Sequence, residues 1–130
     1  MKREYIVPSR PETDRVELFL PMPPSVNAMF GNRKGGRYKT PVYAAWIEQA
    51  GLELLTQRPG RVSGKYEILI QVPRIGTRKG SDVGNREKAI SDLMTKHGVI
   101  TDDSYCERII IEWRNGENVR IVLSRWNDAP

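Results

Sequence analysis

The chain has 130 residues, of which 38% are hydrophobic and 28% are charged, and its formal net charge at pH 7 is +5. This composition is typical of a soluble globular protein with one core, and no apolar run is long enough to cross a membrane. There is no signal-peptide pattern. The only cysteine, Cys106, cannot form an intrachain disulfide, so we expect a protein of the reducing cytoplasm. The positive charge favours a polyanionic partner.

Residues 1–14 are polar and include two prolines, which predicts a flexible or loosely attached arm. We expect residues 15–130 to form one domain, because they contain no internal repeat and no linker-like stretch. Arg15–Leu20 alternates apolar side chains with others and should form the first strand. The prolines that follow end this strand, because proline has no backbone N–H to donate.

Two predicted loops are basic. The first spans Gly31–Thr40 and the second spans Arg74–Ser81. Their candidate DNA-binding residues are Arg33, Lys34, Arg37, Lys39, Arg74, Arg78 and Lys79. Lysine and arginine can meet phosphates, the glycines of the first loop permit close backbone approach, and Tyr38 can stack on an unpaired base. The alternative for the first loop is a mobile hairpin tip with solvated charges.

Thr40 and Pro41 predict the start of a helix, since a hydroxyl can cap it and proline suits its first position. The helix should run to about Gln57. Its apolar stripe over residues 42–54 is broad, which indicates burial on more than one side, either against the sheet or in a dimer interface. A second strand is expected over Lys65–Val72.

The stretch Ser81–Glu107 is predicted to contain a second helix. Ser81 or Asp82 can cap its start, and Gly98 is placed to end it in a left-handed turn. Residues near helical spacing should form its inner face, namely Val83, Arg86, Ile90, Leu93, Met94 and His97. His97 is the only histidine, and its place on this apolar side gives little support to Ser/His or Cys/His catalysis.

Polar groups gather at both ends of this second helix. Asp82, Asn85 and Lys88 lie at its start, and Asp102 and Asp103 follow its C-terminal turn. Carboxylates, an amide and a lysine at the positive end of a helix suit a hydrated Mg²⁺ and a phosphate. The alternative is that Asp82 is only a cap and that the adjacent aspartates form a solvated turn.

Two further strands are predicted over Cys106–Arg114 and Asn118–Trp126. Asn115-Gly116 between them is a strong signal for a two-residue hairpin. The order is therefore strand, helix, strand, helix, strand, strand. It predicts an α/β fold, with a small mixed sheet, two helices and a C-terminal β-hairpin.

With these elements in place, the sequence resembles the RusA family of Holliday junction resolvases, also called crossover junction endodeoxyribonucleases. Leu20–Asn27 resembles the proline-rich segment after the family's first strand. Asp82–Tyr105 resembles the pattern D-x-D-N-x-x-K, followed by an amphipathic helix, a glycine, two apolar residues and D-D. The order of elements between these blocks also agrees, so the resemblance covers most of the chain.

The resemblance implies a homodimeric, Mg²⁺-dependent nuclease that nicks four-way DNA junctions symmetrically. Because one carboxylate of the family pattern is missing here, as described below, we also expect Mn²⁺ to substitute for Mg²⁺. By position, Asp82 matches the first metal-binding aspartate and Asn85 matches the asparagine of the motif. Lys88 matches the catalytic lysine. Asp103 matches the aspartate after the helix, with Asp102 as its acidic neighbour and a further candidate ligand.

One position departs from the family pattern. Gly84 stands where the second aspartate of D-x-D-N is expected, so one carboxylate is missing. Asp102 or a water is the nearest candidate to complete the metal shell. Asp92, about two turns along the polar stripe of the helix that also carries Asn85, is expected to lie farther away. An alternative is a non-catalytic branched-DNA-binding protein of the same fold, inactive because of Gly84. A third hypothesis is a basic interaction module that does not bind nucleic acid.

Overall fold

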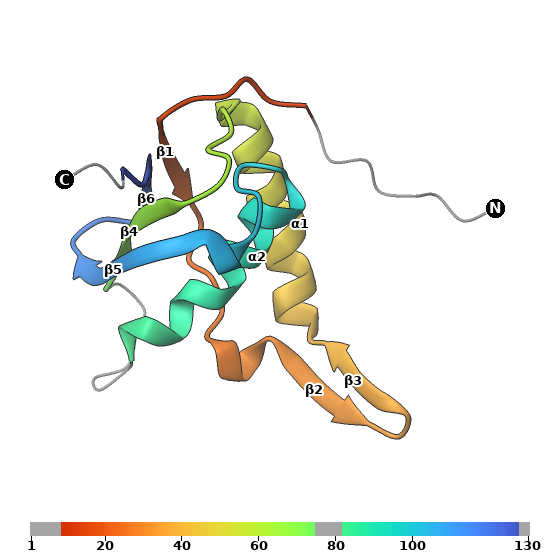
Figure 1. Cartoon of the computed structure of the whole chain (residues 1–130). Coiled ribbons are helices and arrows are strands. Elements are labelled where there is room, and N and C mark those ends of the chain that lie inside the picture. Colours follow the sequence, from red (N-terminus) through yellow and green to blue (C-terminus); the bar gives the residue numbers. More distant parts are fainter. Residues whose placement is uncertain (1–8, 75–81, 128–130) are drawn as a thin grey trace.

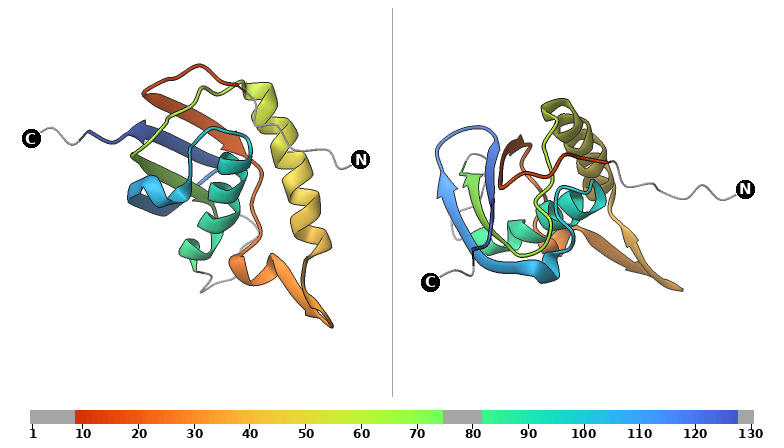
Figure 2. Two further views of the ribbon diagram at one scale, coloured as in Figure 1. Left: turned by 45° about the vertical axis from the view of Figure 1, so that its right-hand side comes forward. Right: turned by 45° about the horizontal axis from the view of Figure 1, so that its top comes forward.

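The computed structural model describes residues 9–74 and 82–127 (Figure 1). Its main sheet has four strands in the order β1-β6-β4-β5. These strands are β1 (Arg15–Leu20), β4 (Tyr66–Pro73), β5 (Cys106–Arg114) and β6 (Val119–Arg125). Two helices, α1 (Pro41–Gln57) and α2 (Glu87–Lys96), lie on one face of the sheet, as the turned views in Figure 2 also show. The expected mixed α/β fold with two helices is confirmed.

The hydrophobic core lies between this sheet and the two helices. Alternate residues of β4, β6 and β1 point inward, and those on the inner face are buried: Tyr66, Ile68, Ile70, Val72, Val119, Ile121, Leu123, Val16, Leu18 and Leu20. From the helices, Trp46, Leu54, Ile90 and Met94 complete the core. The alternation that predicted the strands is therefore the pattern of burial that holds the sheet to its helices.

The two C-terminal strands are present, but they do not form the expected hairpin. β4 lies between them, parallel to β5 and antiparallel to β6. The connection over residues 115–118 therefore passes the end of β4 at Pro73, across about 10 Å at the usual strand spacing. The prediction was wrong about pairing because an Asn-Gly turn indicates a reversal of the chain without specifying its partner strand. β4 buries its whole inner face, which places it in the centre of the sheet.

Helix α1 begins and ends as expected. The Thr40 hydroxyl accepts a hydrogen bond from the Tyr43 backbone N–H at 3.2 Å, with Pro41 at the first helical position. One side of α1 packs on the core. Apolar residues remain exposed on the helix, with Val42 at 64% and Leu52 at 62% relative accessibility. The broad stripe therefore exceeds what the sheet covers.

The segment expected as the first basic loop is a two-stranded hairpin. β2 (Phe30–Arg33) pairs antiparallel with β3 (Gly36–Lys39), and the two form a sheet of their own. Gly35 and Gly36 at the turn have φ values of +94° and +135°, which glycine adopts without a Cβ clash. Figure 1 shows this hairpin projecting from the body of the protein. A hairpin here was only the alternative expectation, and its two strands were not predicted, because they have few apolar residues and little burial.

Residues 9–14, which belong to the expected arm, are hydrogen-bonded to the body. The Arg10 side chain donates to the His97 carbonyl at 2.7 Å and to the Pro59 carbonyl at 3.1 Å. The Arg125 guanidinium donates to Asp14 at 2.8 Å. Residues 1–8 lie outside the described part of the chain. Within the described ranges, none of the helices combines the length and apolar character that crossing a bilayer requires.

Candidate functional site

The segment that begins at Asp82 starts as a 3₁₀ turn, η2 (Val83–Arg86), and continues as α2. Asp82 caps this turn: its Oδ1 accepts a hydrogen bond from the Gly84 N–H at 2.9 Å. Its backbone carbonyl accepts from the Asn85 N–H at 3.2 Å. The single helix expected from Ser81 or Asp82 is thus two elements, and Ser81 lies outside the described residues. Asn85 stands in the 3₁₀ turn, and Lys88 stands in the first turn of α2.

Lys88 lies between two carboxylates. Its Nζ is 3.0 Å from Asp92 Oδ1 and 3.6 Å from Asp103 Oδ2. The three side chains are each between 38% and 48% exposed, so the cluster faces solvent. The pKa of Lys88 is raised, chiefly because Asp92 accepts a hydrogen bond from the ammonium group and next because of the negative charge of Asp92. Lys88 is therefore a fixed positive charge at neutral pH.

The turn after α2 brings Asp103 back to the start of that helix. Gly98, with φ +72°, ends α2 in the left-handed conformation that was expected. Asp103 then opens the 3₁₀ turn η3 (Asp103–Tyr105), which lies beside α2. Residues 15 positions apart in the chain thus meet at Lys88.

Asp92 was absent from the predicted site residues. It lies four residues after Lys88, and side chains with that spacing are neighbours on a helix surface. The signal was present in the polar stripe of α2, but an i,i+4 pair on its own is usually a solvated surface pair. Only the approach of Asp103 shows that this pair belongs to a larger cluster.

Asp102 points to a different partner. Its carboxylate accepts a hydrogen bond from the Ser104 hydroxyl at 2.6 Å, which lowers the pKa of Asp102. Its side chain is exposed, and the neighbouring Asp103, not Asp102, is the one paired with Lys88. The two adjacent aspartates therefore have different local roles.

Gly84 lies next to the Asp82 carboxylate. A Cβ at position 84 would be 3.3 Å from Asp82 Oδ1, so a side chain there would enter the space beside this carboxylate. Across residues 9–74 and 82–127, no three side chains of the histidine, cysteine, aspartate or glutamate types are grouped closely enough to hold a metal ion. Mg²⁺ commonly takes one or two protein carboxylates and keeps several waters. Asp82 and Asp103 supply oxygen donors of that kind.

Arg86 joins η2 to the proline-rich segment. Its Nη1 donates to the Pro23 carbonyl at 2.8 Å, and desolvation lowers the pKa of its guanidinium. The Trp46 indole N–H donates to the Pro21 carbonyl at 3.0 Å, so α1 holds the same segment. These contacts fix the position of the turn that carries Asp82 and Asn85. The spacing of the sequence placed Arg86 on the inner face of the helix, but it carried no signal for this connection.

The basic residues of the hairpin are exposed. The guanidinium of Arg37 lies 4.0 Å from the centroid of the Phe30 ring, and that of Arg33 lies 5.4 Å from the centroid of the Tyr38 ring. Lys34 and Lys39 add two more exposed cations. Cations beside aromatic rings on a projecting hairpin suit a phosphate backbone with accessible bases.

The second basic loop is described only at its start. The Arg74 guanidinium lies 5.1 Å from the centroid of the Trp113 ring, at the end of β4 and β5. Arg78 and Lys79 lie outside the described residues. The first basic segment is thus described in full as a hairpin, whereas Arg74 is the one candidate DNA-binding residue of the second loop within the described residues.

The fold and its polar cluster define a class of protein. A lysine held between Asp92 and Asp103, at the start of a helix whose preceding turn is capped by Asp82, has the composition of a site for a phosphate backbone. The family model named Endodeoxyribonuclease RusA matches residues 21–124, and the chain belongs to this family. This confirms the resemblance seen in the sequence. A search among curated proteins found no match.

Proposed function

We propose that this protein is a structure-specific endodeoxyribonuclease that resolves Holliday junctions by paired symmetric cuts, with Mg²⁺ as its metal. The placement of Lys88 between Asp92 and Asp103, in a chain of the RusA family, carries this proposal. Negative charge builds on the phosphate and the leaving oxygen as a phosphodiester is hydrolysed. A positive charge fixed beside that position stabilises the transition state. Lys88 supplies such a charge.

Asp82 and Asp103 are the proposed metal-binding residues, with Asp102 as a further candidate. Bound Mg²⁺ supplies an activated water and polarises a phosphoryl oxygen. Asn85 is proposed to orient a water or a ligand carboxylate from the 3₁₀ turn next to Asp82. Mn²⁺ is expected to substitute for Mg²⁺.

The DNA is proposed to bind across the basic hairpin and the start of the second basic loop. Contacts from these cations to the phosphate backbone position the duplex arms without reading their sequence. The hairpin projects from the body, so it can reach an arm that leaves the branch point. The single cysteine fits an expected cytoplasmic location.

A homodimer is proposed because two symmetric cuts are most simply made by two identical sites related by a two-fold axis. The exposed apolar side chains of α1, Val42, Leu52 and Leu55, agree with an additional contact surface. Light scattering should show a dimer at micromolar concentration. A monomer that still cuts junctions in a paired manner would contradict the proposal.

The second candidate is a non-catalytic protein that binds branched DNA. The observation that favours it is Gly84, which leaves the space beside the Asp82 carboxylate without a second carboxylate. The basic hairpin would bind DNA equally well in such a protein.

One experiment separates the two candidates. Purified protein is incubated with a labelled four-way junction and with a matched linear duplex, with and without Mg²⁺ or Mn²⁺. The nuclease proposal expects paired nicks in the junction, metal dependence and an intact linear duplex. Junction binding without cleavage at any metal concentration would establish the non-catalytic alternative. Equal weak binding to both DNAs, without cleavage, would contradict both.

A further inference from the structure

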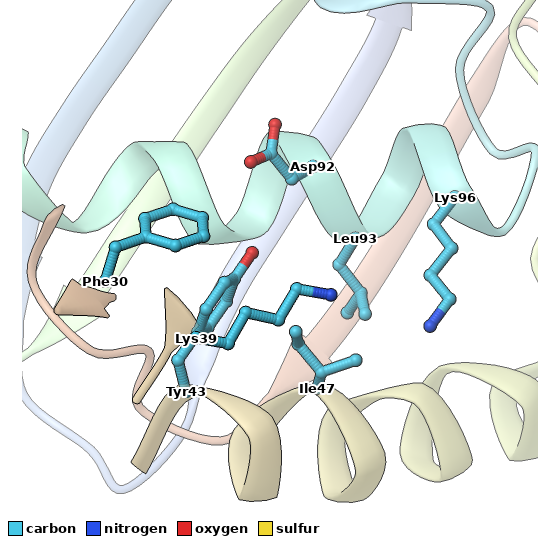
Figure 3. Close-up of a pocket in the computed structure, with 7 residues that line it drawn as sticks. All are labelled: Phe30, Lys39, Tyr43, Ile47, Asp92, Leu93 and Lys96. Carbon is cyan, nitrogen blue, oxygen red and sulfur yellow. The ribbon is translucent and has the colours of Figure 1, made fainter. Parts of the chain in front are cut away.

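A pocket of about 240 Å³ lies between the base of the hairpin and the two helices (Figure 3). Its principal lining residues come from four elements, β2, β3, α1 and α2, and are Phe30, Lys39, Tyr43, Ile47, Asp92 and Leu93. None of the six contributes to the metal-binding set proposed above. The pocket therefore needs an explanation of its own.

The walls of the pocket are aromatic and aliphatic. The rings of Phe30 and Tyr43 meet edge to face, with centroids 5.6 Å apart and an angle of 72° between their planes. Ile47 and Leu93 form apolar sides between the helices. Apolar and aromatic side chains favour a flat, weakly hydrated group such as a nucleobase.

The rim of the pocket is polar and carries a net positive charge. Figure 3 shows the Lys39 side chain reaching across from the hairpin and that of Lys96 descending from α2. Asp92 lies on the α2 side. Two ammonium groups suit a phosphate, while a carboxylate can accept a hydrogen bond from the exocyclic amino group of a base. This combination matches one nucleotide.

The pocket adjoins the proposed site of cleavage. Asp92 lines the pocket and also pairs with Lys88 at 3.0 Å. On its other side, Lys39 and Phe30 belong to the hairpin that carries Arg37. A DNA strand running from Lys88 to the hairpin would cross the mouth of the pocket.

We propose that this pocket receives one unpaired nucleobase of a DNA junction, displaced from the stack beside the branch point, with a neighbouring phosphate at its lysine rim. The proposal rests on the proposed function, since it requires that junction DNA is bound. Pockets for drug-sized ligands usually occupy roughly 300–1,000 Å³, so this smaller one suits a single base. Extruding a base costs least where pairing is already lost, and a branch point offers such bases.

An abasic scan tests this proposal. Four-way junctions carry a tetrahydrofuran residue at one position at a time around the branch point, and gel shifts without divalent metal measure the Kd. We expect one position in an arm at which removing the base weakens wild-type binding about tenfold, as stacking energies imply. No effect at any position would overturn the proposal.

Two variants link that position to the pocket. Ile47→Trp fills the space between the helices, and Phe30→Leu removes the aromatic wall. Each should weaken binding of the intact junction about tenfold and should lose sensitivity to the abasic substitution. Thr56→Trp is the matched control, because it adds the same ring at an exposed position of α1. Circular dichroism and thermal unfolding show that the compared proteins are folded.

The outcomes separate this proposal from the function on which it rests. If both folded variants keep wild-type sensitivity to the abasic position while the junction is bound, the pocket does not hold the base and only this inference fails. If the wild type does not bind the intact junction, the proposed function and this inference fail together.

Discussion

Lys88 is the positive centre of the candidate site, and its two carboxylate partners differ in origin. Asp92 comes from the same helix, whereas Asp103 arrives after the Gly98 turn. A bound metal at Asp103 would leave Asp92 in place as the partner of Lys88. The lysine can therefore stay ordered while Asp103 binds another cation.

Replacing Lys88 should therefore affect the chemical step. We expect Lys88→Ala to lower the rate of junction cleavage by about 10²–10³, the usual cost of removing one group that stabilises transition-state charge.

Asp82→Asn and Asp103→Asn should abolish cleavage and leave junction binding intact, because each removes a proposed metal ligand along with negative charge facing the DNA. Single-turnover cleavage and gel shifts measure the two effects separately. If any of these variants cleaves the junction at the wild-type rate, the substituted residue does not have the role proposed for it.

The position of Gly84 leads to a second prediction at this scale. A side chain there would stand beside the Asp82 carboxylate, at a distance the flexible Asp82 side chain can accommodate. Gly84→Asp should therefore lower the Mg²⁺ concentration required for half-maximal cleavage, about tenfold if one ligand is gained, in line with typical effects of metal-site residues. Gly84→Asn is the control, since it has the same shape without the charge.

A metal titration of the cleavage rate measures this change. If Gly84→Asp leaves the metal dependence unchanged while Asp102→Asn has no effect, a ligand other than these two completes the shell. Cleavage by Gly84→Asp with an inactive wild type would favour the non-catalytic alternative.

At the scale of elements, the basic hairpin is an independent two-stranded sheet. Hairpins with so little apolar burial have marginal stability on their own, and the Arg37–Phe30 and Arg33–Tyr38 contacts help to hold this one. Gly31 allows the Tyr38 ring to lie across β2, since a Cβ at that position would come within 2.5 Å of the ring. The hairpin therefore presents its cations from a defined surface.

Neutralising this hairpin should change the salt dependence of DNA binding. In the triple variant Arg33→Gln, Lys34→Gln and Arg37→Gln, we expect the slope of log Kobs against log salt concentration to decrease by about 0.9 for each phosphate that the hairpin no longer neutralises. Binding isotherms from low to moderate salt measure the slope. Arg15→Gln, at the edge strand β1, is the control. An unchanged slope in the triple variant would place the hairpin away from the DNA.

At the scale of the whole molecule, His97 connects the helices and the N-terminal segment. Its ring lies against Gly51 of α1, where an added Cβ would be 3.1 Å from His97 Nε2. Its carbonyl accepts from Arg10. Within the described part of the chain, its buried Nδ1 has no hydrogen-bond partner. Burial, and next the charges of Lys96 and Arg10, lower the pKa of His97.

This lowered pKa predicts a loss of stability in mild acid. The unfolded chain binds the proton more readily than the folded one, so protonation favours unfolding. Above the ordinary pKa of 6.5, His97 is neutral in both states and does not make the free energy of unfolding depend on pH. As the pH falls from there toward the lower pKa of the folded state, His97 decreases the free energy of unfolding. We expect the wild-type Tm to fall more than that of His97→Gln between pH 7.5 and about 5.5. Equal decreases in Tm for the two proteins would show that titratable groups other than His97 cause the loss of stability in acid.

The sequence by itself determined the elements whose signals are local. The cap at Thr40-Pro41, the left-handed Gly98 and the alternation of Arg15–Leu20 are each satisfied within a few residues, and all three were predicted correctly. The proline-rich block and the Asp82–Tyr105 pattern also identified the family. Such features depend on backbone geometry and side-chain types that a short stretch specifies completely.

Only the tertiary structure decided which elements meet. β4 separates β5 from β6 because the most fully buried strand requires a partner on each side, and the Asn115 turn carries no information about that. Asp103 reaches Lys88 because η3 lies beside α2, and Asp92 gains its significance from that contact. Sequence spacing describes neighbours along the chain, whereas burial of the core selects neighbours across it.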